Sequence, residues 1–111
     1  MIRLPWPPTV NHYYTVARGR KILSKRGREY KKWCAAELML QKPLRSRQGD
    51  VRVCINAYPP DKRRRDLDNL IKPVLDVLTE CGLIEDDSLV VDLRIQRFNS
   101  VKGGKVEIMV D

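Results

Sequence analysis

The chain has 111 residues, of which 42% are hydrophobic, and it carries a net charge of +8. This length predicts one domain, residues 1–111, with a modest core and little room for a second. No apolar run approaches the ~20 residues of a membrane span and no signal-like leader opens the chain, so we expect a cytoplasmic protein without a membrane partner. The three cysteines are an odd count with wide spacing, which excludes a disulfide framework or a paired zinc motif.

Positive charge is concentrated in the first half of the chain. Residues 1–50 carry 12 Lys and Arg against 3 Asp and Glu, whereas residues 51–111 carry 10 against 11. Such segregation is typical of a surface that binds a polyanion. The alternative is an ordinary solvated surface, as charge runs usually are. A cationic run beside an acidic cluster, described below, favours contact with nucleic acid.

The first 23 residues predict a short strand and then an irregular region. Residues 1–4 alternate apolar and polar side chains, and the Pro-rich run 5–8 ends this strand. Residues 9–23 indicate a loop or irregular hairpin, in which two tyrosines precede a cationic turn at 18–21. This mixture suits base stacking and phosphate pairing. The alternative is that the aromatic residues pack over one end of the core, which we favour for Trp6.

A helix is predicted from Ser24, as the N-cap, to about Gln41, with Pro43 ending it. Cationic side chains cover one of its faces. Its expected apolar stripe consists of Tyr30, Trp33, Cys34, Leu38 and Met39. The helix should therefore bury this stripe and leave its cations in solvent.

Residues 51–58 alternate apolar and polar side chains, which predicts a strand with one buried face. Periodicity then changes, and residues 68–80 show the apolar spacing of an amphipathic helix, with Gly82 as its C-terminal cap. Pro73 must lie in the first turn of this helix or kink it, because proline removes one helical hydrogen bond.

Two further strands complete the predicted fold. Residues 89–96 alternate, with the apolar side chains of Leu89, Val91, Leu93 and Ile95 expected to face inward. Lys102–Gly104 predicts a hairpin turn into a last strand at 106–110. The order is strand, helix, strand, helix, strand, strand. We therefore predict a two-layer single α/β domain with a mixed β-sheet packed by two helices.

The acidic residues that follow the 51–58 strand predict a metal site. Four cations, Lys62–Arg65, directly precede Asp66 and Asp68. If these aspartates end a strand, their side chains point the same way, because side chains alternate between the faces of an extended chain. The next helix returns the chain, so Asp87 could approach both. Three converging carboxylates suit Mg²⁺, which prefers oxygen ligands.

Lys72 lies four residues after Asp68 on the same face of the predicted helix, where its ammonium could reach a phosphoryl oxygen or the attacking water. Simpler interpretations remain open. Asp68 could be only an N-cap, Asp66 and Asp87 exposed turn residues, and Lys72 a surface lysine. An Asp-x-Asp pair alone is a weak signal. His12, the only histidine, has no ligand partner at suitable spacing, and the absence of a phosphate-binding glycine motif predicts no nucleotide cofactor.

Several motifs occur together along the chain. They are Leu-Pro-Trp-Pro-Pro at 4–8 with Asn11 and the tyrosine pair, the segment Pro60–Lys72 with its Arg-Arg-Asp-Leu-Asp-Asn-Leu run, Asp76, Asp86-Asp87 and the turn at 102–104. With these motifs the chain resembles the RusA family of Holliday-junction resolvases, dimeric endonucleases carried by bacteria and their prophages. The Asp-Leu-Asp-Asn-Leu-x-Lys run after basic residues is the most specific part.

By this resemblance, Asp66, Asp68 and Asp87 are the expected Mg²⁺ ligands, with Mn²⁺ as the alternative ion, and Lys72 is the expected catalytic lysine. The implied enzyme is a hydrolase, a crossover junction endodeoxyribonuclease that leaves a 5′-phosphate and a 3′-hydroxyl. A four-way junction has approximate twofold symmetry, so the paired symmetric nicks that resolve it suit a C₂ homodimer. A role in host DNA repair and recombination and one in phage replication both stay open.

We predict DNA contacts from the cationic run, the cationic turn and neighbouring side chains. These residues are Lys62, Arg63, Arg64, Arg65, Asn69, Arg18, Arg20, Lys21, Tyr13 and Tyr14. The leading hypothesis is a Mg²⁺-dependent endonuclease selective for branched DNA. One alternative is a non-catalytic nucleic-acid-binding module whose aspartates only cap and orient. A phosphohydrolase of small substrates is another, but it leaves the basic half unexplained.

Overall fold

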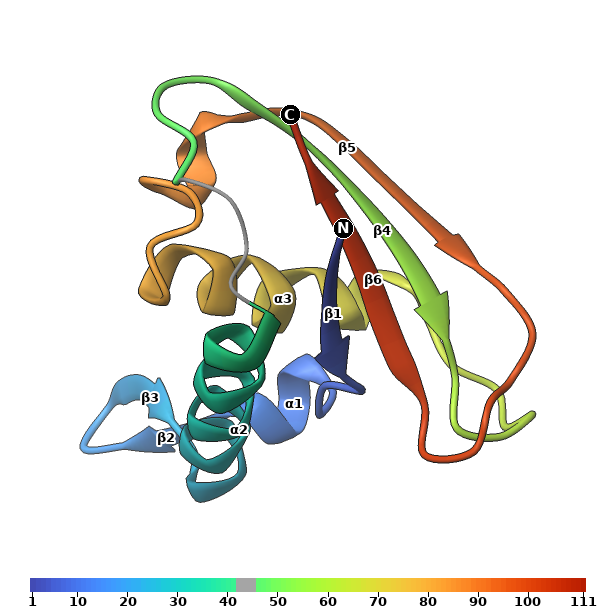
Figure 1. Ribbon diagram of the computed structural model, residues 1–111. Coiled ribbons are helices and arrows are strands. Elements are labelled where there is room, and N and C mark those ends of the chain that lie inside the picture. The colour runs from blue at the N-terminus through green and yellow to red at the C-terminus, as the bar shows by residue number, and fades with distance from the viewer. Residues whose placement is uncertain (42–45) are drawn as a thin grey trace.

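The computed structural model describes residues 1–41 and 46–111, so the predicted helix end at Pro43 lies outside the described residues. The strands are β1 (Ile2–Pro5), β2 (Tyr14–Ala17), β3 (Arg20–Leu23), β4 (Val51–Tyr58), β5 (Val90–Arg97) and β6 (Lys105–Val110). The helices are α1 (Val10–Tyr13), α2 (Lys25–Gln41), α3 (Asp68–Glu80) and the short 3₁₀ helix η1 (Asp87–Leu89). The predicted α/β class with a mixed sheet is confirmed (Figure 1).

The main sheet has the strand order β1-β6-β4-β5, and β2 and β3 form a separate hairpin. β6 runs antiparallel to both β1 and β4, whereas β4 and β5 are parallel because α3 crosses over between them. The prediction that β5 and β6 form a hairpin through Lys102–Gly104 is therefore wrong. The loop instead crosses the end of β4, where the Val101 amide donates to the Pro59 carbonyl at 2.9 Å.

α2 begins as predicted, because the Ser24 hydroxyl accepts a hydrogen bond from the Gly27 amide at 3.0 Å. Gly27 also allows α2 to pack closely, since a Cβ atom there would lie 2.4 Å from the Tyr13 carbonyl oxygen. The buried face is narrower than predicted. Trp33 and Met39 are 56% and 78% exposed, because only positions on the stripe of Gly27, Tyr30, Cys34 and Leu38 face the sheet and α3.

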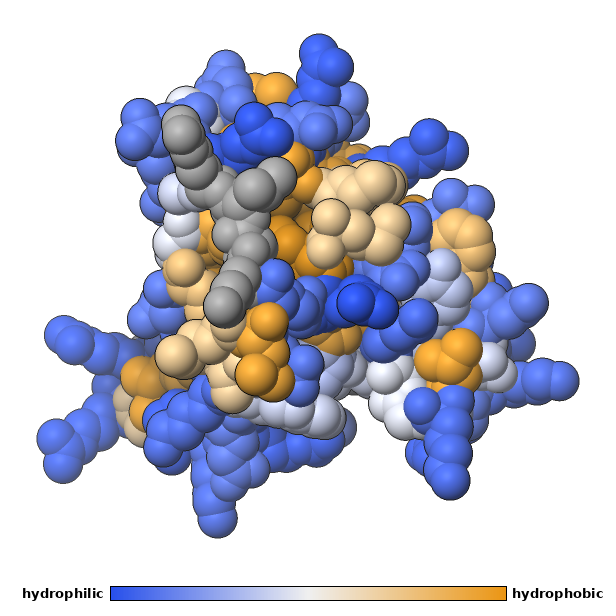
Figure 2. Space-filling model, in the orientation of Figure 1, coloured by the Kyte–Doolittle hydropathy of each residue, from blue (hydrophilic) through white to orange (hydrophobic). Residues whose placement is uncertain are grey.

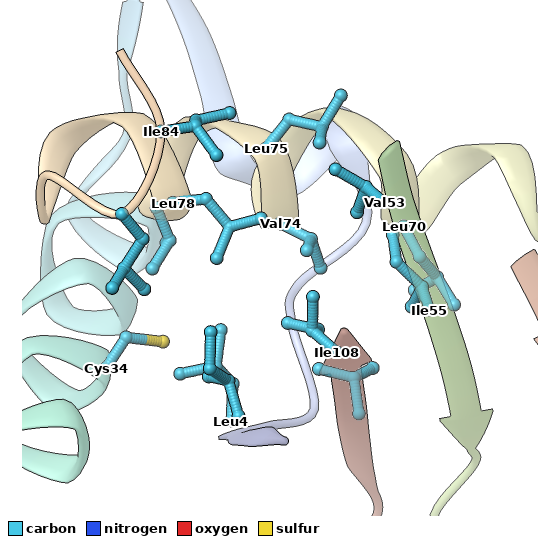
Figure 3. Close-up of a cluster of buried hydrophobic side chains, with 14 of the residues drawn as sticks. Leu4, Cys34, Val53, Ile55, Leu70, Val74, Leu75, Leu78, Ile84 and Ile108 are labelled. Atoms are coloured by element: carbon cyan, nitrogen blue, oxygen red, sulfur yellow. The ribbon is translucent and has the colours of Figure 1, made fainter. Parts of the chain in front are cut away.

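α3 supplies the centre of the core. Leu70, Val74 and Leu78 are at most 2% exposed, and Figure 3 shows side chains of α3 pointing toward Ile55 and Ile108 of the sheet. Gly82 ends the helix with φ of +77°, a left-handed conformation that glycine adopts without strain. α3 begins at Asp68, so Pro73 lies beyond its first turn. Its side chain is buried.

β5 is an edge strand whose apolar side chains are only partly covered. Val91 and Leu93 are 62% and 37% exposed, and no β5 side chain belongs to the buried core. Leu93 pairs in register with Val53, so the two side chains lie on the same face of the sheet. The helices cover this face at β4. The expectation that this strand buries one face is thus correct only for Ile95, which packs against the core together with Val90. It is wrong for Val91 and Leu93, which no other element of the described chain covers.

Candidate active site

Three polar residues of α3 form a line along the side of the helix that faces away from the core. Asp68, Lys72 and Asp76, hereafter the polar stripe, lie four residues apart and therefore project in similar directions. The buried side chains of the same helix include Val74 and Leu78 on the other side. Burial of that side fixes the rotation of α3, so the polar stripe is held at the surface.

Lys72 connects α3 to η1. Its Nζ lies 2.7 Å from Asp87 Oδ2 and 3.1 Å from Asp76 Oδ1. The hydrogen bond to Asp87, followed by that to Asp76, raises the pKa of the Lys72 ammonium, so it stays protonated. Asp86 sets the start of η1, because its Oδ2 accepts a hydrogen bond from the Ser88 amide at 2.9 Å. The crossover therefore brings Asp87 to α3, as the sequence indicates.

Asp66 and Asp68 do not end a strand, contrary to the condition on which their predicted convergence depended. Asp66 lies in an irregular segment and Asp68 is the first residue of α3. Leu67 between them has helical backbone, with φ −62° and ψ −34°, and residues two apart diverge where the backbone is helical. Leu67 also occupies the N-cap position, so the N-cap interpretation of Asp68 is wrong.

Across residues 1–41 and 46–111, no three Asp, Glu, His or Cys side chains are grouped closely enough to hold a metal ion. The chemistry of the aspartates nevertheless fits one. Asp66 and Asp68 are exposed, and no described residue forms an ion pair with either. Unpaired carboxylate oxygens are the ligands that hard divalent cations take. The side chains of Asp66, Asp68 and Asp87 would have to turn toward one another to share an ion.

The basic segment, Lys62–Arg65, contains two cations that form ion pairs and two that do not. Asp61 binds Arg65 through Oδ1 at 2.7 Å and Arg63 through Oδ2 at 3.3 Å. These contacts lower the pKa of the Asp61 carboxyl to about 2, and the hydrogen bond from Arg65 has the largest effect. Lys62 and Arg64 are exposed and form no ion pair within the described chain. Asp61 therefore shapes the segment and leaves two cations available to a ligand.

Two clefts border the basic segment. The smaller, about 300 Å³, is lined by Trp6, Thr9, Arg64, Arg65, Asp66, Asn69 and Leu70. Trp6 packs against the core, as the sequence favoured, and the guanidinium of Arg65 lies over its ring at 5.7 Å. The second cleft, about 600 Å³, lies between the basic segment and the end of β5, and Arg97, Phe98 and Asn99 help to line it.

The β2–β3 hairpin carries the other predicted cations. Arg18 and Gly19 form its turn with φ of 52° and 72°, and Arg18, Arg20 and Lys21 are exposed. Long hydrophilic side chains project from the part of the surface where the hairpin and α2 lie (Figure 2). Lys21 Nζ lies 4.5 Å from the centroid of the Tyr14 ring. The hairpin therefore presents a cationic surface remote in sequence from the basic segment.

The two predicted tyrosines have different environments. Tyr13 is fully buried and its ring packs edge-on against Tyr30, so the structure corrects the prediction that it contacts DNA. The short helix α1 turns its ring inward, and burial raises the pKa of its hydroxyl. Tyr14 is partly exposed, and its hydroxyl donates a hydrogen bond to Asp76 Oδ2.

Sequence reasoning did not assign roles to Asp76, Arg97 or Phe98. Asp76 contacts both Lys72 and Tyr14, and its position four residues after Lys72 is a signal that could have identified it. Arg97 and Phe98 follow a strand in a region of ordinary composition, and only the fold places them across a cleft from Lys62 and Arg64.

A family model described as "Endodeoxyribonuclease RusA" matches residues 5–111. The chain belongs to the RusA family. Proteins named crossover junction endodeoxyribonuclease RusA from Shigella sonnei (strain Ss046) and Escherichia coli (strain K12) are each 39% identical to it over 116 residues. The relative of that name from Enterobacteria phage 82 is also 39% identical. Each comparison covers 98% of this chain and 91% of the relative.

RusA membership confirms the resemblance drawn from the Pro-rich opening and the Asp-Leu-Asp-Asn-Leu-x-Lys run. A RusA protein among the relatives belongs to a phage, which agrees with the expected occurrence of the family in prophages. Among the helices of the described chain, none has the length and apolar character needed to cross a bilayer.

Proposed function

We propose that the protein is a metal-dependent DNA endonuclease that resolves four-way junctions by paired symmetric nicks. The observation that carries the proposal is the ion pair between Lys72 of α3 and Asp87 of η1, because α3 also begins with the unpaired Asp68. Asp66 and the basic segment directly precede that helix. Carboxylates for a cation, a protonated lysine and unpaired cations for phosphates together match hydrolysis of a phosphodiester. The names of the RusA relatives support the same activity.

Asp66, Asp68 and Asp87 would hold Mg²⁺, or alternatively Mn²⁺. When bound, the divalent ion supplies an activated water and stabilises negative charge that develops on the phosphoryl group. Water adds to phosphorus and the bond to the 3′-oxygen breaks, so the products carry a 5′-phosphate and a 3′-hydroxyl. Lys72, kept protonated by its carboxylate neighbours, stabilises charge on a phosphoryl oxygen.

The DNA surface in this proposal combines the basic segment with the β2–β3 hairpin. Lys62 and Arg64 bind phosphates because Asp61 does not neutralise them, and Arg18, Arg20 and Lys21 bind a second arm of the junction. Asn69 lines the cleft beside Asp66 and contacts the strand near the cut. Each neutralised phosphate releases counterions, so the affinity for a junction should fall steeply with salt. A nearly flat dependence of log affinity on log salt would contradict this surface.

A homodimer would supply two active sites in the twofold relation that a junction requires. The exposed apolar side chains of Val91 and Leu93 on β5 support an interface there with a second copy. Among the strands of the described chain, β5 pairs only with β4, so its outer edge is open. Light scattering should give a dimer mass for the wild type and a monomer mass for Val91→Glu.

The deciding experiment is cleavage of a synthetic four-way junction, with linear duplex of the same sequence as control. Wild type, Asp68→Asn and Asp50→Asn are each assayed with Mg²⁺, with Mn²⁺ and with EDTA. Asp50, an exposed carboxylate just before β4, makes no ion pair within the described chain and serves as the matched control. Paired nicks that require the ion and Asp68, but not Asp50, are the expected result.

The alternative is a nucleic-acid-binding module without catalysis. The observation that favours it is that no group of three metal-ligating side chains is assembled among the described residues. In that case wild type and Asp68→Asn would bind the junction equally tightly, and neither Mg²⁺ nor Mn²⁺ would produce nicks. Binding without cutting in every arm would therefore reject the endonuclease and leave the binding module.

A further inference from the structure

Asp76 of the polar stripe has a different partner for each of its two carboxylate oxygens. Its Oδ1 lies 3.1 Å from Lys72 Nζ, and its Oδ2 accepts a hydrogen bond from the Tyr14 hydroxyl. Its side chain is 20% exposed, whereas that of Lys72 is 48% exposed. Both carboxylate oxygens are thus occupied, and one partner comes from a hairpin that is 62 residues away in the chain.

A surface ion pair four residues apart on a helix usually contributes little and forms transiently. Two observations distinguish Asp76 from such a pair. The tyrosine hydroxyl fixes the second oxygen of the carboxylate, so the first oxygen has little freedom to leave Lys72. Moreover, the Tyr14 ring packs edge-on against the fully buried Tyr13, with centroids 4.9 Å apart, which fixes the tyrosine.

Lys72 also binds Asp87, at 2.7 Å. In the proposed function Asp87 would also hold a divalent ion, and sharing its carboxylate with the ion would weaken its bond to Lys72. A lysine released from its only anchor would sample many rotamers of its four-carbon chain. Asp76 is a second anchor that does not take part in holding the ion, so it can keep the ammonium in place.

We propose that Asp76 is a positioning residue that holds Lys72 toward the scissile phosphate, and that Tyr14 orients Asp76. This inference rests on the proposed endonuclease function. It gives the β2–β3 hairpin a second role, because Tyr14 is the first residue of β2 and Lys21 of β3 lies over its ring. A DNA arm bound by the hairpin thereby lies next to the group that orients the catalytic lysine.

The kinetic test compares Asp76→Asn and Tyr14→Phe with wild type on a four-way junction at saturating metal. We expect Asp76→Asn to lower kcat about tenfold or more, as loss of a charge-assisted contact does, with KM and junction affinity within about twofold. Tyr14→Phe should lower kcat by a smaller factor, and the double variant should be no slower than Asp76→Asn alone, because both act through one contact. Asp76→Glu should recover part of the lost rate.

Matched controls are Asp50→Asn, at an exposed aspartate just before β4, and Tyr58→Phe, at the end of β4. They make the same chemical changes, and both should leave kcat unchanged. Thermal melting of each variant shows whether the fold is retained. If Asp76→Asn unfolds, the decision passes to Tyr14→Phe, which removes only a hydroxyl. Unchanged kcat in Tyr14→Phe and in a folded Asp76→Asn would overturn the proposal, and so would a loss confined to KM.

A second measurement does not depend on catalysis. Acetylation by N-hydroxysuccinimide acetate, followed by mass spectrometry, reports how freely Lys72 reacts in the metal-free protein. Lys72 should react faster in Asp76→Asn/Asp87→Asn than in Asp87→Asn alone, with Lys102 as an exposed internal reference. Equal rates would overturn the anchor. If wild type fails to cut while these rates differ, the endonuclease proposal fails and the contact of Asp76 with Lys72 stands.

Discussion

One side of α3 packs in the core of the fold, and the other carries the residues proposed for chemistry. One side buries Leu70, Val74 and Leu78 among residues of the sheet and of α2. The other side carries the polar stripe, which joins α3 to η1 and to the hairpin through charged contacts. The buried side places the helix and contributes to stability, whereas the polar stripe contributes little to stability and has no packing requirement for its residue types. One helix thus separates the residues that hold the fold from those proposed for chemistry.

Lys72→Gln should give the largest effect on the polar stripe. We expect kcat for junction cleavage to fall about 10²-fold to 10³-fold, the usual loss when a charge-stabilising donor is removed. The free energy of unfolding should change by less than about 1 kcal/mol, because Lys72 is 48% exposed and exposed ion pairs contribute little. Single-turnover cleavage and urea denaturation measure the two quantities. A stability loss as large as the activity loss would erase the distinction between the two sides.

Leu78→Ala should give the opposite pattern. Leu78 is fully buried, so its truncation should lower the free energy of unfolding by about 2–5 kcal/mol. The rate per folded molecule should stay near that of wild type at a temperature where the variant is folded. Leu40→Ala on α2 is the control, because Leu40 is 80% exposed and its truncation should cost distinctly less. Equal losses in both variants would contradict the placement of the core.

The basic segment offers a finer comparison between a held and an unpaired cation. Arg64→Gln should lower junction affinity and reduce the slope of log affinity against log salt by about 0.9, the value for one lost phosphate contact. Arg63→Gln should change the slope less, because Asp61 Oδ2 already binds the Arg63 guanidinium at 3.3 Å. Fluorescence anisotropy across a salt series measures both. Identical slopes for the two variants would show that pairing with Asp61 does not make Arg63 less available to phosphates than Arg64.

The smallest expected effect is the pH dependence of the same segment. The folded-state pKa of Asp61 is about 2, below its ordinary value of 3.8. A lowered pKa means that the stabilising contribution is present above the ordinary value and is lost as the pH falls toward 2. Trp6 fluorescence in a Trp33→Phe background should therefore stay constant from pH 8 to about pH 4 and change below it. In Asp61→Asn this acid transition should disappear, whereas its persistence would assign it to another carboxyl.

Local features of the fold were predictable because side-chain periodicity reports them directly. β4, α3 and the Ser24 cap of α2 follow from alternation, helical spacing and capping chemistry, and the structure confirms each. The burial of β5 was mispredicted, although its alternation is as clear as that of β4. Alternation shows which side chains share a face, but whether another layer covers that face depends on where the helices pack.

The candidate site divides in the same way. The spacing of Asp68 and Lys72 and the cationic run were evident in the sequence, and the approach of Asp87 followed from one helical crossover. Asp66 and Asp68 were expected to end a strand, whereas Leu67 between them has helical backbone, so their divergence was missed. Likewise, adjacent tyrosines gave no sign that Tyr13 enters the core while Tyr14 reaches Asp76.

The sequence by itself determined the family, the amphipathic helices, the central strand and the residue types available for metal and phosphate chemistry. These properties depend on neighbours within a few positions, where local sterics and hydrophobic spacing decide the outcome. The tertiary structure alone decided that β4 lies between β5 and β6. It also decided that Lys72 lies between Asp76 and Asp87. The strand order and the position of Lys72 depend on how segments far apart in the chain pack.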